Sequence, residues 1–302
     1  MKKILLLAIF AAAALTQIQA QDQAIFSHYN ISPILIHPAA AGFGGQHQLL
    51  FNARMQWTGF PDAPKTFMAQ YNGPLSKSFG IGFGVLSESA AQLRRTRAQL
   101  NYAIRFPLGD DWEMAAGFST ELHQIRLHGS VSENGFLDLG DRIIDANMDG
   151  IRFLDASVGV YGTFKKNTFG GLSFTNLVRS RLGGLVVSDE KESLFNYYVF
   201  YLGHKFEVED LNFTLEPSVM ARQIRDVPFQ MDINLKAGFL DEQLLAGVSY
   251  RSLGVMGVML GTQVSAFNLY YTYDVSFQQF QQFNDGAHEV TVALNMKKKG
   301  KK

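Results

Sequence analysis

The chain has 302 residues, 27 basic and 27 acidic side chains, and no cysteine. Its length permits one large β domain or two smaller domains, and its balanced charge gives no argument for nucleic acid or for acidic partners. The lack of cysteine excludes disulfides, thiolate nucleophiles and cysteine-based metal sites. Aromatic residues make up 13% of the chain, with 25 Phe and 11 Tyr, a level that favours strands and membrane interfaces.

Residues 1–20 have the pattern of a secretory signal peptide. Two lysines follow the first methionine, an apolar run extends from Ile4 to Leu15, and the small residue Ala20 ends the segment. The run is too short for a transmembrane helix, and Gln21 rather than cysteine follows the expected cleavage point, so no lipid anchor is expected. The pattern predicts an exported chain that is either soluble or an outer-membrane barrel.

Residues 21–46 contain two prolines and no alternation of apolar and polar side chains, so no strand is expected there. The apolar side chains of this segment need an apolar environment. We expect the segment either to plug the lumen of a barrel or to lie across its periplasmic rim. Its apolar side chains are Ile25, Phe26, Tyr29, Ile34, Leu35 and Ile36.

Residues 47–296 are dominated by apolar–polar alternation with a period of two, which is typical of half-buried strands. The stretch PFQMDINLKAGFL is a clear example, because every second residue from Phe229 to Phe239 is apolar. The pattern recurs in about 14 segments, at about 47–57, 65–73, 79–87, 92–106, 112–124, 152–164, 168–178, 194–206, 211–223, 229–240, 243–251, 254–263, 266–278 and 286–296.

The connections between these segments alternate in length. Those on one expected rim are mostly short, whereas several on the other rim are long, at about 125–151, 179–193 and 279–285. This arrangement is typical of a transmembrane antiparallel β-barrel with short periplasmic turns, and an even strand number places the ends of the strand region on the periplasmic rim. A soluble β-sandwich is the alternative. Long strands and aromatic residues near strand ends favour the barrel.

A barrel fixes the direction of the side chains. We expect Phe229 to Phe239 to present their apolar face to lipid, and Asp232 and Lys236 to face the lumen. The other charged residues expected to face the lumen are Arg95, Arg97, Arg105, Glu121, Asp155, Glu216, Arg222, Asp274 and Glu289.

Three sequence blocks resemble the PorP/SprF family of outer-membrane proteins, found with the type IX secretion and gliding machinery of Bacteroidetes. They are DQAIFSHYNISPILIHPAAAGFGG (22–45), RMQWTGFPDAPKT (54–66) and YTYDVSFQQFQQFNDGAHEVTVAL (271–294). One departure is Asp62, where the family often has Gly. The signature residues of the first two blocks are Pro38, Ala39, Gly42, Trp57, Gly59, Phe60, Ala63, Pro64, Lys65 and Thr66.

The resemblance implies a non-enzymatic outer-membrane barrel that cooperates with a secreted protein carrying a type IX C-terminal signal domain and with periplasmic components of the machine. It implies no cofactor. The organisation expected is a signal peptide at 1–20, a plug or rim segment at 21–46, the barrel at 47–296 and a basic tail at 297–302. The aromatic and apolar residues Phe26, Tyr29, Leu35, Trp57 and Phe60 are candidates for partner contact; a rigid structural turn is the other reading of the Trp57 block.

Catalytic motifs are not found. The sequence has no Gly-x-Ser-x-Gly, no His-Glu-x-x-His and no glycine-rich phosphate loop, so an outer-membrane hydrolase is a remote option. The stretch DANMDG (145–150) has the first half of a calcium loop in Asp145, Asn147 and Asp149, but position 12 is Ala156 where a bidentate Glu is required. An Asp- and Gly-rich turn is the simpler explanation, and a calcium site is the alternative.

Two functions of different classes follow. The first is an outer-membrane component of the type IX secretion or gliding machinery that docks a secreted surface protein. The second is a passive channel or a transporter of hydrophobic substrates. A lumen plugged by the N-terminal segment favours docking, and an open lumen favours the channel.

Overall fold

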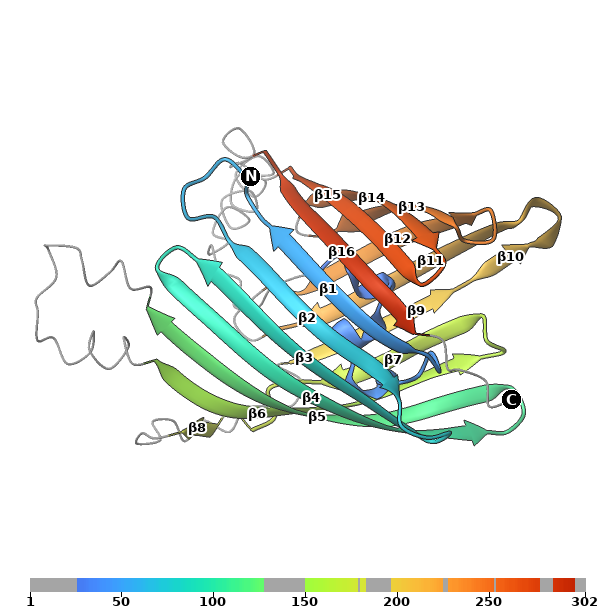
Figure 1. The fold of residues 1–302 in the computed structure, drawn as a ribbon, viewed down its shortest axis with the longest axis horizontal. Helices are drawn as coiled ribbons and strands as arrows, with labels where there is room; N and C mark the ends of the chain where they lie inside the picture. Colours follow the sequence, from blue (N-terminus) through green and yellow to red (C-terminus); the bar gives the residue numbers. More distant parts are fainter. Residues whose placement is uncertain are drawn as a thin grey trace, which may run out of the picture.

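The strands of the chain pair antiparallel with their neighbours and close into one barrel (Figure 1). The structure, a computed structural model, describes residues 26–127, 150–178, 180–182, 197–224, 228–252, 254–277 and 285–296. The expected signal peptide, the calcium motif and the basic tail lie outside these residues. No helix in the described ranges is long and apolar enough to cross a bilayer.

The strands follow one another around the wall in chain order. They are β1 (His47–Met55), β2 (Lys65–Pro74), β3 (Phe79–Ala90), β4 (Leu93–Leu108), β5 (Trp112–Leu127), β6 (Ile151–Phe164), β7 (Thr168–Phe174), β8 (Ser180–Leu182), β9 (Tyr198–His204), β10 (Phe206–Val208), β11 (Phe213–Gln223), β12 (Gln230–Phe239), β13 (Leu244–Arg251), β14 (Val255–Val264), β15 (Phe267–Ser276) and β16 (Ala287–Met296).

These segments make the 14 strands that the sequence predicts. β9 and β10 pair with β11 in one continuous register and are separated only at Lys205. β7 and β8 both pair with β6, so β8 extends the same strand where the sequence predicts a loop. The barrel closes because β1 pairs with both β2 and β16, and β9 pairs with both β7 and β11.

The two rims differ as expected. At the rim where His47 pairs with Met296, called here the short-turn rim, the connections are 75–78, 109–111, 165–167, 209–212, 240–243 and 265–266. At the opposite rim, the long-loop rim, the connections include 56–64, 128–150 and 277–286. The strand region therefore begins and ends on the short-turn rim, as the alternation of loop lengths predicts.

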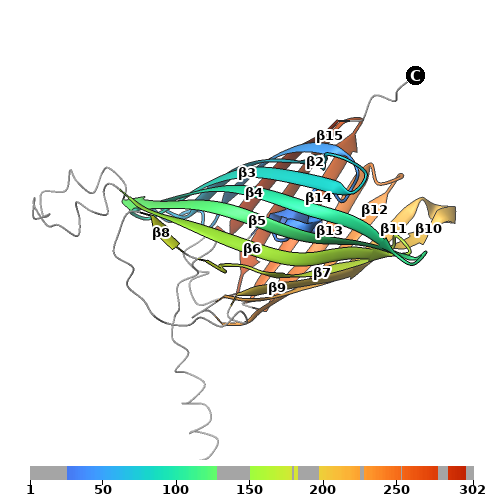
Figure 2. The ribbon, with the colours of Figure 1, turned by 90° about the horizontal axis from the view of Figure 1, so that it is seen from below.

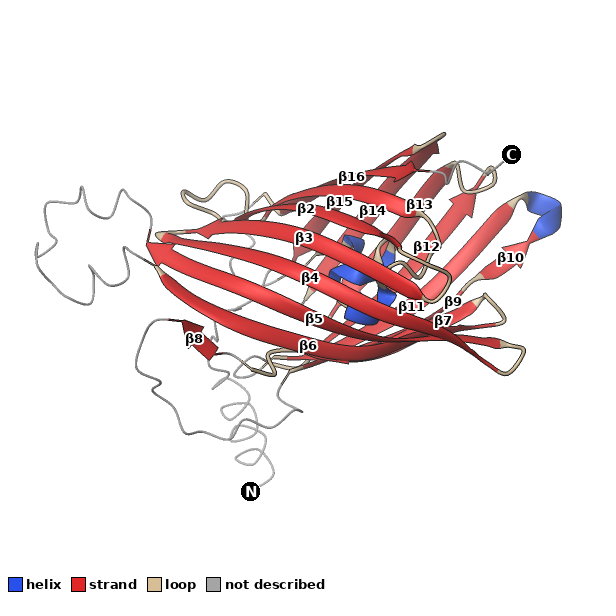
Figure 3. Ribbon diagram, turned by 60° about the horizontal axis from the view of Figure 1, so that its bottom comes forward, coloured by secondary structure: helices blue, strands red, loops and turns tan. Residues whose placement is uncertain are grey.

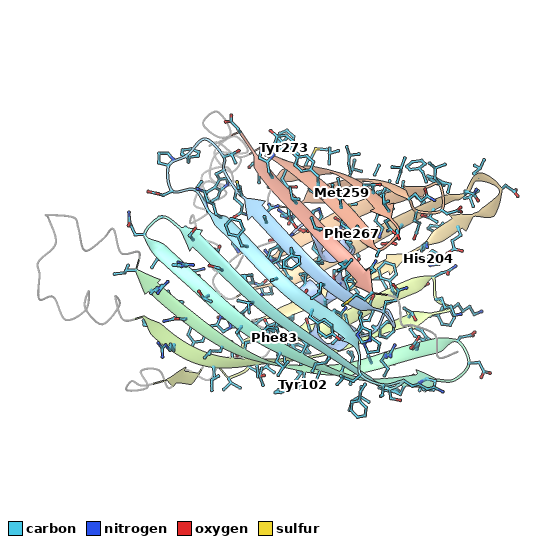
Figure 4. The ribbon with its side chains drawn as sticks, viewed as in Figure 1. Phe83, Tyr102, His204, Met259, Phe267 and Tyr273 are labelled. Carbon is cyan, nitrogen blue, oxygen red and sulfur yellow. The ribbon has the colours of Figure 1, made fainter. Side chains whose placement is uncertain are left out.

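The predicted facing of β12 is confirmed. Ile233 and Leu235 are 50% and 42% exposed, whereas Asp232 and Asn234 are buried. The wall follows the same rule elsewhere, as Phe83, Tyr102 and Phe267 illustrate (Figure 4). Outward aromatic residues gather close to the short-turn rim, where such rings sit at a membrane interface. They are Phe79, Phe106, Trp112, Phe206, Phe239 and Phe267.

The charged residues predicted to face the lumen occupy the inward-pointing positions of their strands. Seven of them are buried: Glu121, Asp155, Glu216, Arg222, Asp232, Asp274 and Glu289. The other four are less buried and lie within ion-pair distance of a carboxylate: Arg95, Arg97, Arg105 and Lys236. Most of these inward charges therefore have a partner of opposite charge within ion-pair distance.

Residues 26–46 lie inside the barrel, where Figures 2 and 3 show short helical turns enclosed by the strands. These turns are η1 (His28–Asn30), η2 (Pro33–Leu35) and η3 (Pro38–Ala40). Ser27 contacts Glu289 and Arg54, which lie near the long-loop ends of their strands, whereas His47 begins β1 at the short-turn rim. The described chain therefore starts near the long-loop end of the lumen and runs to the opposite rim.

Candidate functional site

Residues 26–46, called the plug below, form three short turns, two of which begin at a proline. Pro33 and Pro38 each open a 3-10 turn, where the missing N–H costs no hydrogen bond. Within the turns, the N–H groups of Ile36 and Ala41 donate to the carbonyls of Pro33 and Pro38 at 3.1 and 3.2 Å. The segment thus satisfies its backbone locally and can enter a lumen without pairing as a strand.

Glycines on the inner wall let the plug approach closely. A Cβ at Gly117 would meet the Pro38 carbonyl carbon at 2.6 Å, and a Cβ at Gly159 would meet the His37 ring at 2.7 Å. Gly42 has φ of +64°, and a Cβ there would lie 2.7 Å from the backbone of Gly80. η3 consequently packs directly against β4, β5 and β6, and the small residues of the plug and wall fit each other.

A buried polar cluster fastens the start of the plug to the wall. This cluster, called the clasp, consists of Ser27, His28, Arg54, Asp274 and Glu289. Arg54 bridges Asp274 at 2.6 Å and Glu289 at 2.9 Å, and all three side chains are at most 2% exposed. The backbone N–H groups of Ser27 and His28 donate to the two oxygens of Glu289 at 2.8 and 3.2 Å. A carboxylate in this position is therefore shared between a cation and the plug backbone.

His28 lies in the clasp with its Nδ1 3.1 Å from a carboxylate oxygen of Glu289. Burial lowers its pKa below the ordinary value, although Glu289 acts in the opposite direction. Nδ1 lies 2.7 Å from the Thr291 hydroxyl and Nε2 lies 2.8 Å from the Thr272 hydroxyl. A neutral imidazole has one donor and one acceptor nitrogen, and a hydroxyl can pair with either. The strands β15 and β16 thus hold both sides of the ring.

A second polar cluster holds the middle of the plug. Asn234 donates to the Tyr29 hydroxyl at 2.8 Å, and Arg251 donates to Asp232 at 3.2 Å. Gln230 connects this pair to Arg222, because its amide donates to Asp232 and its carbonyl accepts from the Arg222 guanidinium. The plug is therefore anchored to β12 as well as to the clasp, and side chains of β11 and β13 hold the neighbouring groups of β12 in place.

The Trp57 block forms a connection at the long-loop rim that is hydrogen-bonded to its neighbours on both sides. Residues 56–64, called the rim segment, are held to the neighbouring β15–β16 connection, since Thr58 donates to the Gly286 carbonyl at 3.0 Å and accepts from Asp285 at 2.7 Å. Ala91 donates to the Asp62 carbonyl at 2.9 Å on the other side. Asp62 has φ of +56°, a left-handed conformation that Gly and Asp both tolerate, so Asp fits the backbone at the position where the resemblance led us to expect Gly.

The candidate partner contacts fall into two groups. Phe26, Tyr29 and Leu35 are buried in the lumen, where they face the wall. Trp57 and Phe60 are 52% and 40% exposed on the rim segment. The signature residues divide in the same way, because Pro38, Ala39 and Gly42 belong to the plug, and Gly59 to Thr66 form the rim segment and the start of β2.

The sequence analysis did not identify two arginines of the lumen, and it did not identify the wall glycines on which the plug packs. Arg54 and Arg251 were not expected in the lumen, yet each pairs with a buried carboxylate. Gly80 and Gly82 face inward two residues apart on β3, and the plug approaches both of them closely, through the Ala41 backbone and the Ile34 side chain. In the part of the chain that the structure describes, no group of three His, Asp or Glu side chains is placed to hold a metal ion.

Comparisons with known proteins agree with this geometry. Residues 18–294 match the family described as "Type IX secretion system membrane protein PorP/SprF". No curated protein matches the chain. The monoaromatic hydrocarbon channel CymD is similar in fold, with a TM-score of 0.51, 9% identity, and coverage of 90% of this chain and 91% of that chain.

Two further solved structures are similar to the chain at low identity. The Pseudomonas putida toluene transporter TodX has a TM-score of 0.49 and 9% identity, with 92% of this chain and 94% of that chain covered. The Acinetobacter baumannii outer membrane protein Omp33 has a TM-score of 0.47 and 8% identity, with 84% and 98% covered. The chain is an outer-membrane β-barrel and belongs to the PorP/SprF family of type IX secretion system membrane proteins.

Proposed function

We propose that this barrel docks a secreted surface protein at the outer membrane and links it to periplasmic components of the type IX secretion or gliding machinery. The partner expected is a protein with a type IX C-terminal signal domain. The barrel acts by binding rather than by catalysis and needs no cofactor. Lipid of the outer membrane surrounds the barrel. We propose neither a nucleic-acid partner nor a soluble substrate.

The filled lumen is the observation that carries this proposal. A passive channel needs a continuous aqueous path, whereas a docking protein does not. The plug occupies the lumen with short turns that pack on glycines of the wall. The clasp holds the start of the plug, and the cluster around Tyr29 holds its middle. Moving the plug would separate a buried carboxylate from its partners, which is strongly unfavourable.

The rim segment supplies the contact surface. In outer-membrane barrels the short turns face the periplasm and the longer connections face outward. This orientation puts Trp57 and Phe60 at the cell surface, and exposed aromatic side chains are common anchors of protein interfaces. Direct contact by Phe26, Tyr29 and Leu35 would require the plug to move, so the proposal assigns them to holding the plug.

Two measurements test docking against transport. The surface proteome of a deletion strain should lose one or a few large secreted proteins, while liposomes containing the purified barrel should be no more permeable to small solutes than liposomes with an unrelated plugged barrel. High permeability combined with an unchanged surface proteome would refute docking and favour the channel.

A further inference from the structure

Positive charge collects on the outside of one half of the barrel. β2 to β6 lie side by side there (Figure 1). The outward-facing positions of these strands carry charge only at the long-loop ends, and every charged side chain among them is basic. They are Lys65, Arg94, Arg126 and Arg152, called the basic row below. In the part of the chain that the structure describes, the outward-facing positions of β9 to β16 hold no lysine, arginine or carboxylate.

Three members of the basic row are neighbours on the wall. Arg94 on β4 and Arg126 on β5 are directly opposite each other across the strand pair. Arg152 on β6 lies opposite Gln124, so it is the diagonal neighbour of Arg126. Side chains that face each other on one side of a sheet have Cβ atoms about 5 Å apart, and diagonal neighbours are about 7–8 Å apart. Guanidinium groups at these positions are therefore within reach of one tetrahedral anion.

The placement of Arg94 opposite Arg126 is unfavourable without an anion. Like charges directly opposite each other on one face of a sheet destabilise the strand pair. The inward-facing arginines of β4 each lie within ion-pair distance of a glutamate. Among the described residues, no carboxylate forms an ion pair with Arg94, Arg126 or Arg152. A bound phosphate would remove the repulsion, because its oxygens accept the paired N–H groups of guanidinium ions.

The basic row lies at the level expected for lipid headgroups. β5 carries only uncharged outward-facing residues from Trp112, at the short-turn rim, to Leu122. This stretch is about 33 Å long, and at a strand tilt of about 40° it spans about 25 Å, the usual height of the lipid-facing band. Arg126 follows Leu122 by four residues, and Arg152 precedes Leu154 by two. Since the long connections of such barrels face the cell surface, both arginines lie at the outer leaflet.

Apolar surface adjoins the arginines on the membrane side. Ala98, Leu122 and Leu154 lie opposite one another across β4, β5 and β6, and the two leucines are both 43% exposed. Thr96 and Gln124 form the uncharged step between them and the arginines. A ligand that covers both parts needs a phosphate with acyl chains attached to it. This is the chemistry of a phosphorylated lipid rather than of a soluble anion.

We propose that the basic row binds a phosphate of lipid A, the phosphorylated glycolipid of the outer leaflet, with Arg94 and Arg126 holding the phosphate and the acyl chains lying along the apolar wall of β4 to β6. The bound lipid neutralises the two opposed arginines and so stabilises this half of the barrel. The site is on the outside of the wall and involves neither the plug nor the rim segment, so it is independent of the proposed docking function.

A binding measurement with the purified barrel in detergent tests the chemistry. The probe is monophosphoryl lipid A, compared with the same lipid after enzymatic removal of its phosphate. We expect the phosphorylated form to bind at least about tenfold more tightly, as loss of charge-assisted hydrogen bonds predicts. The Arg94→Gln, Arg126→Gln double variant should lose most of this preference. Arg95→Gln is the matched control, because Arg95 adjoins Arg94 in the chain but faces the lumen.

Equal binding of the two lipids would overturn the proposal, and so would an equal loss of binding in Arg95→Gln. Inorganic phosphate alone is a further probe. It should bind far more weakly than the lipid, because it has no acyl chains to cover the apolar wall. Binding of inorganic phosphate as tight as that of the lipid would show a site for a free anion and would overturn the lipid assignment.

The temperature of unfolding provides a second measurement. In detergent and buffer without phosphate, the double variant should be at least as stable as the unchanged barrel, because the repulsion between two arginines is removed. Added lipid A should raise the temperature of unfolding of the unchanged barrel and of Arg95→Gln, but not that of the double variant, since a ligand stabilises the folded state that binds it. A double variant that is less stable without lipid, or that fails to fold, would show that other groups of the barrel hold these arginines, and would overturn the proposal.

Discussion

The backbone N–H of Ser27 donates a hydrogen bond of 2.8 Å to the carboxylate of Glu289, 262 positions further along the chain. Glu289 lies on β16, and Arg54, which forms an ion pair with it, lies on β1. β1 and β16 are the first and last strands, and their pairing closes the barrel. The plug is therefore fastened over the closing seam, so seating of the plug and closure of the barrel stabilise each other.

Glu289→Ala should loosen the plug more than any single surface change. It leaves Arg54 with one carboxylate and two plug N–H groups without an acceptor, and breaking a buried ion pair costs about 3–5 kcal/mol. The expected result is a lower temperature of unfolding and raised solute leakage in liposomes. Asp111→Asn is the control, because its pair with Lys165 is 3.8 Å long and exposed, and such pairs contribute about 0–1 kcal/mol. Equal effects of the two changes would contradict the clasp.

Gly117→Ala should unseat η3 without opening the wall. A Cβ at this position would meet the backbone of Pro38 at 2.6 Å, and backbone cannot move away as a flexible side chain can. Overpacking of this kind costs about 1–3 kcal/mol. Gly84→Ala is the matched control on the same inner surface, since its Cβ would meet Gln70 at 3.7 Å, an ordinary contact. Protease sensitivity of the plug in the folded barrel measures the difference. Equal sensitivity of both variants would show that η3 does not need glycine at position 117 to pack against the wall.

A charge introduced on the lipid face of β12 should impair membrane assembly, whereas a charge introduced on its lumen face should loosen the plug. Leu235→Arg puts a charge on the lipid face and should reduce membrane assembly, at a cost of about 2–4 kcal/mol near the bilayer centre. Asn234→Lys should assemble but lose the hydrogen bond to Tyr29, and so loosen the plug. Heat-modifiable mobility reports assembly, and liposome leakage reports the plug. If both variants fail to assemble equally, the separation of the two faces is wrong.

The period-two alternation made the barrel predictable because lipid and lumen impose opposite chemistry on neighbouring residues. Asp232 and Ile233 are adjacent, yet one is buried among polar groups and the other is half-exposed on the apolar wall. Strand number was predictable for the same reason. The interruption at Lys205 and the strand β8 were not, because neither changes the alternation of the flanking residues.

The candidate site was predictable in its parts but not in its assembly. Aromatic residues marked the plug and the rim segment, and Glu289 and Asp274 were expected in the lumen. Which of the inward charges meet depends on how the wall curves, and a single sequence does not specify this. Arg54 pairs with residues 220 and 235 positions away, so no local pattern indicates the clasp.

The plugged state should weaken in mild acid. Burial lowers the pKa of His37 to about 4 from an ordinary 6.5, and the nearby backbone of Leu172 only partly offsets this. Between about pH 4 and pH 6.5, a displaced plug with an exposed His37 ring therefore binds more protons than the seated plug. Stability of the seated state is fully present above about pH 6.5 and falls as the pH decreases toward 4, by at most about 1.4 kcal/mol per unit.

Liposome leakage measured from pH 7 to pH 4 checks this expectation. His37→Leu removes the titrating group at a site lined by Gly159, Gly171 and Tyr161, and should flatten the part of the pH response that His37 contributes. His28 has a lowered pKa as well and should leave a residual response. An unchanged pH profile in His37→Leu would show that His37 does not control the plug.

Trp57 should contribute to partner attachment through its ring rather than through the shape of the rim segment. Its φ of +51° is uncommon for a bulky residue, whereas glycine adopts this conformation readily. Trp57→Gly therefore removes the ring and preserves the backbone, while Trp57→Phe preserves an aromatic anchor. Loss of a central aromatic anchor costs about 2 kcal/mol or more at an interface, roughly a 30-fold loss of affinity. We expect the surface level of the partner to fall in Trp57→Gly and to recover largely in Trp57→Phe, at equal amounts of folded barrel. Full attachment in Trp57→Gly would show that the rim segment has only a structural role.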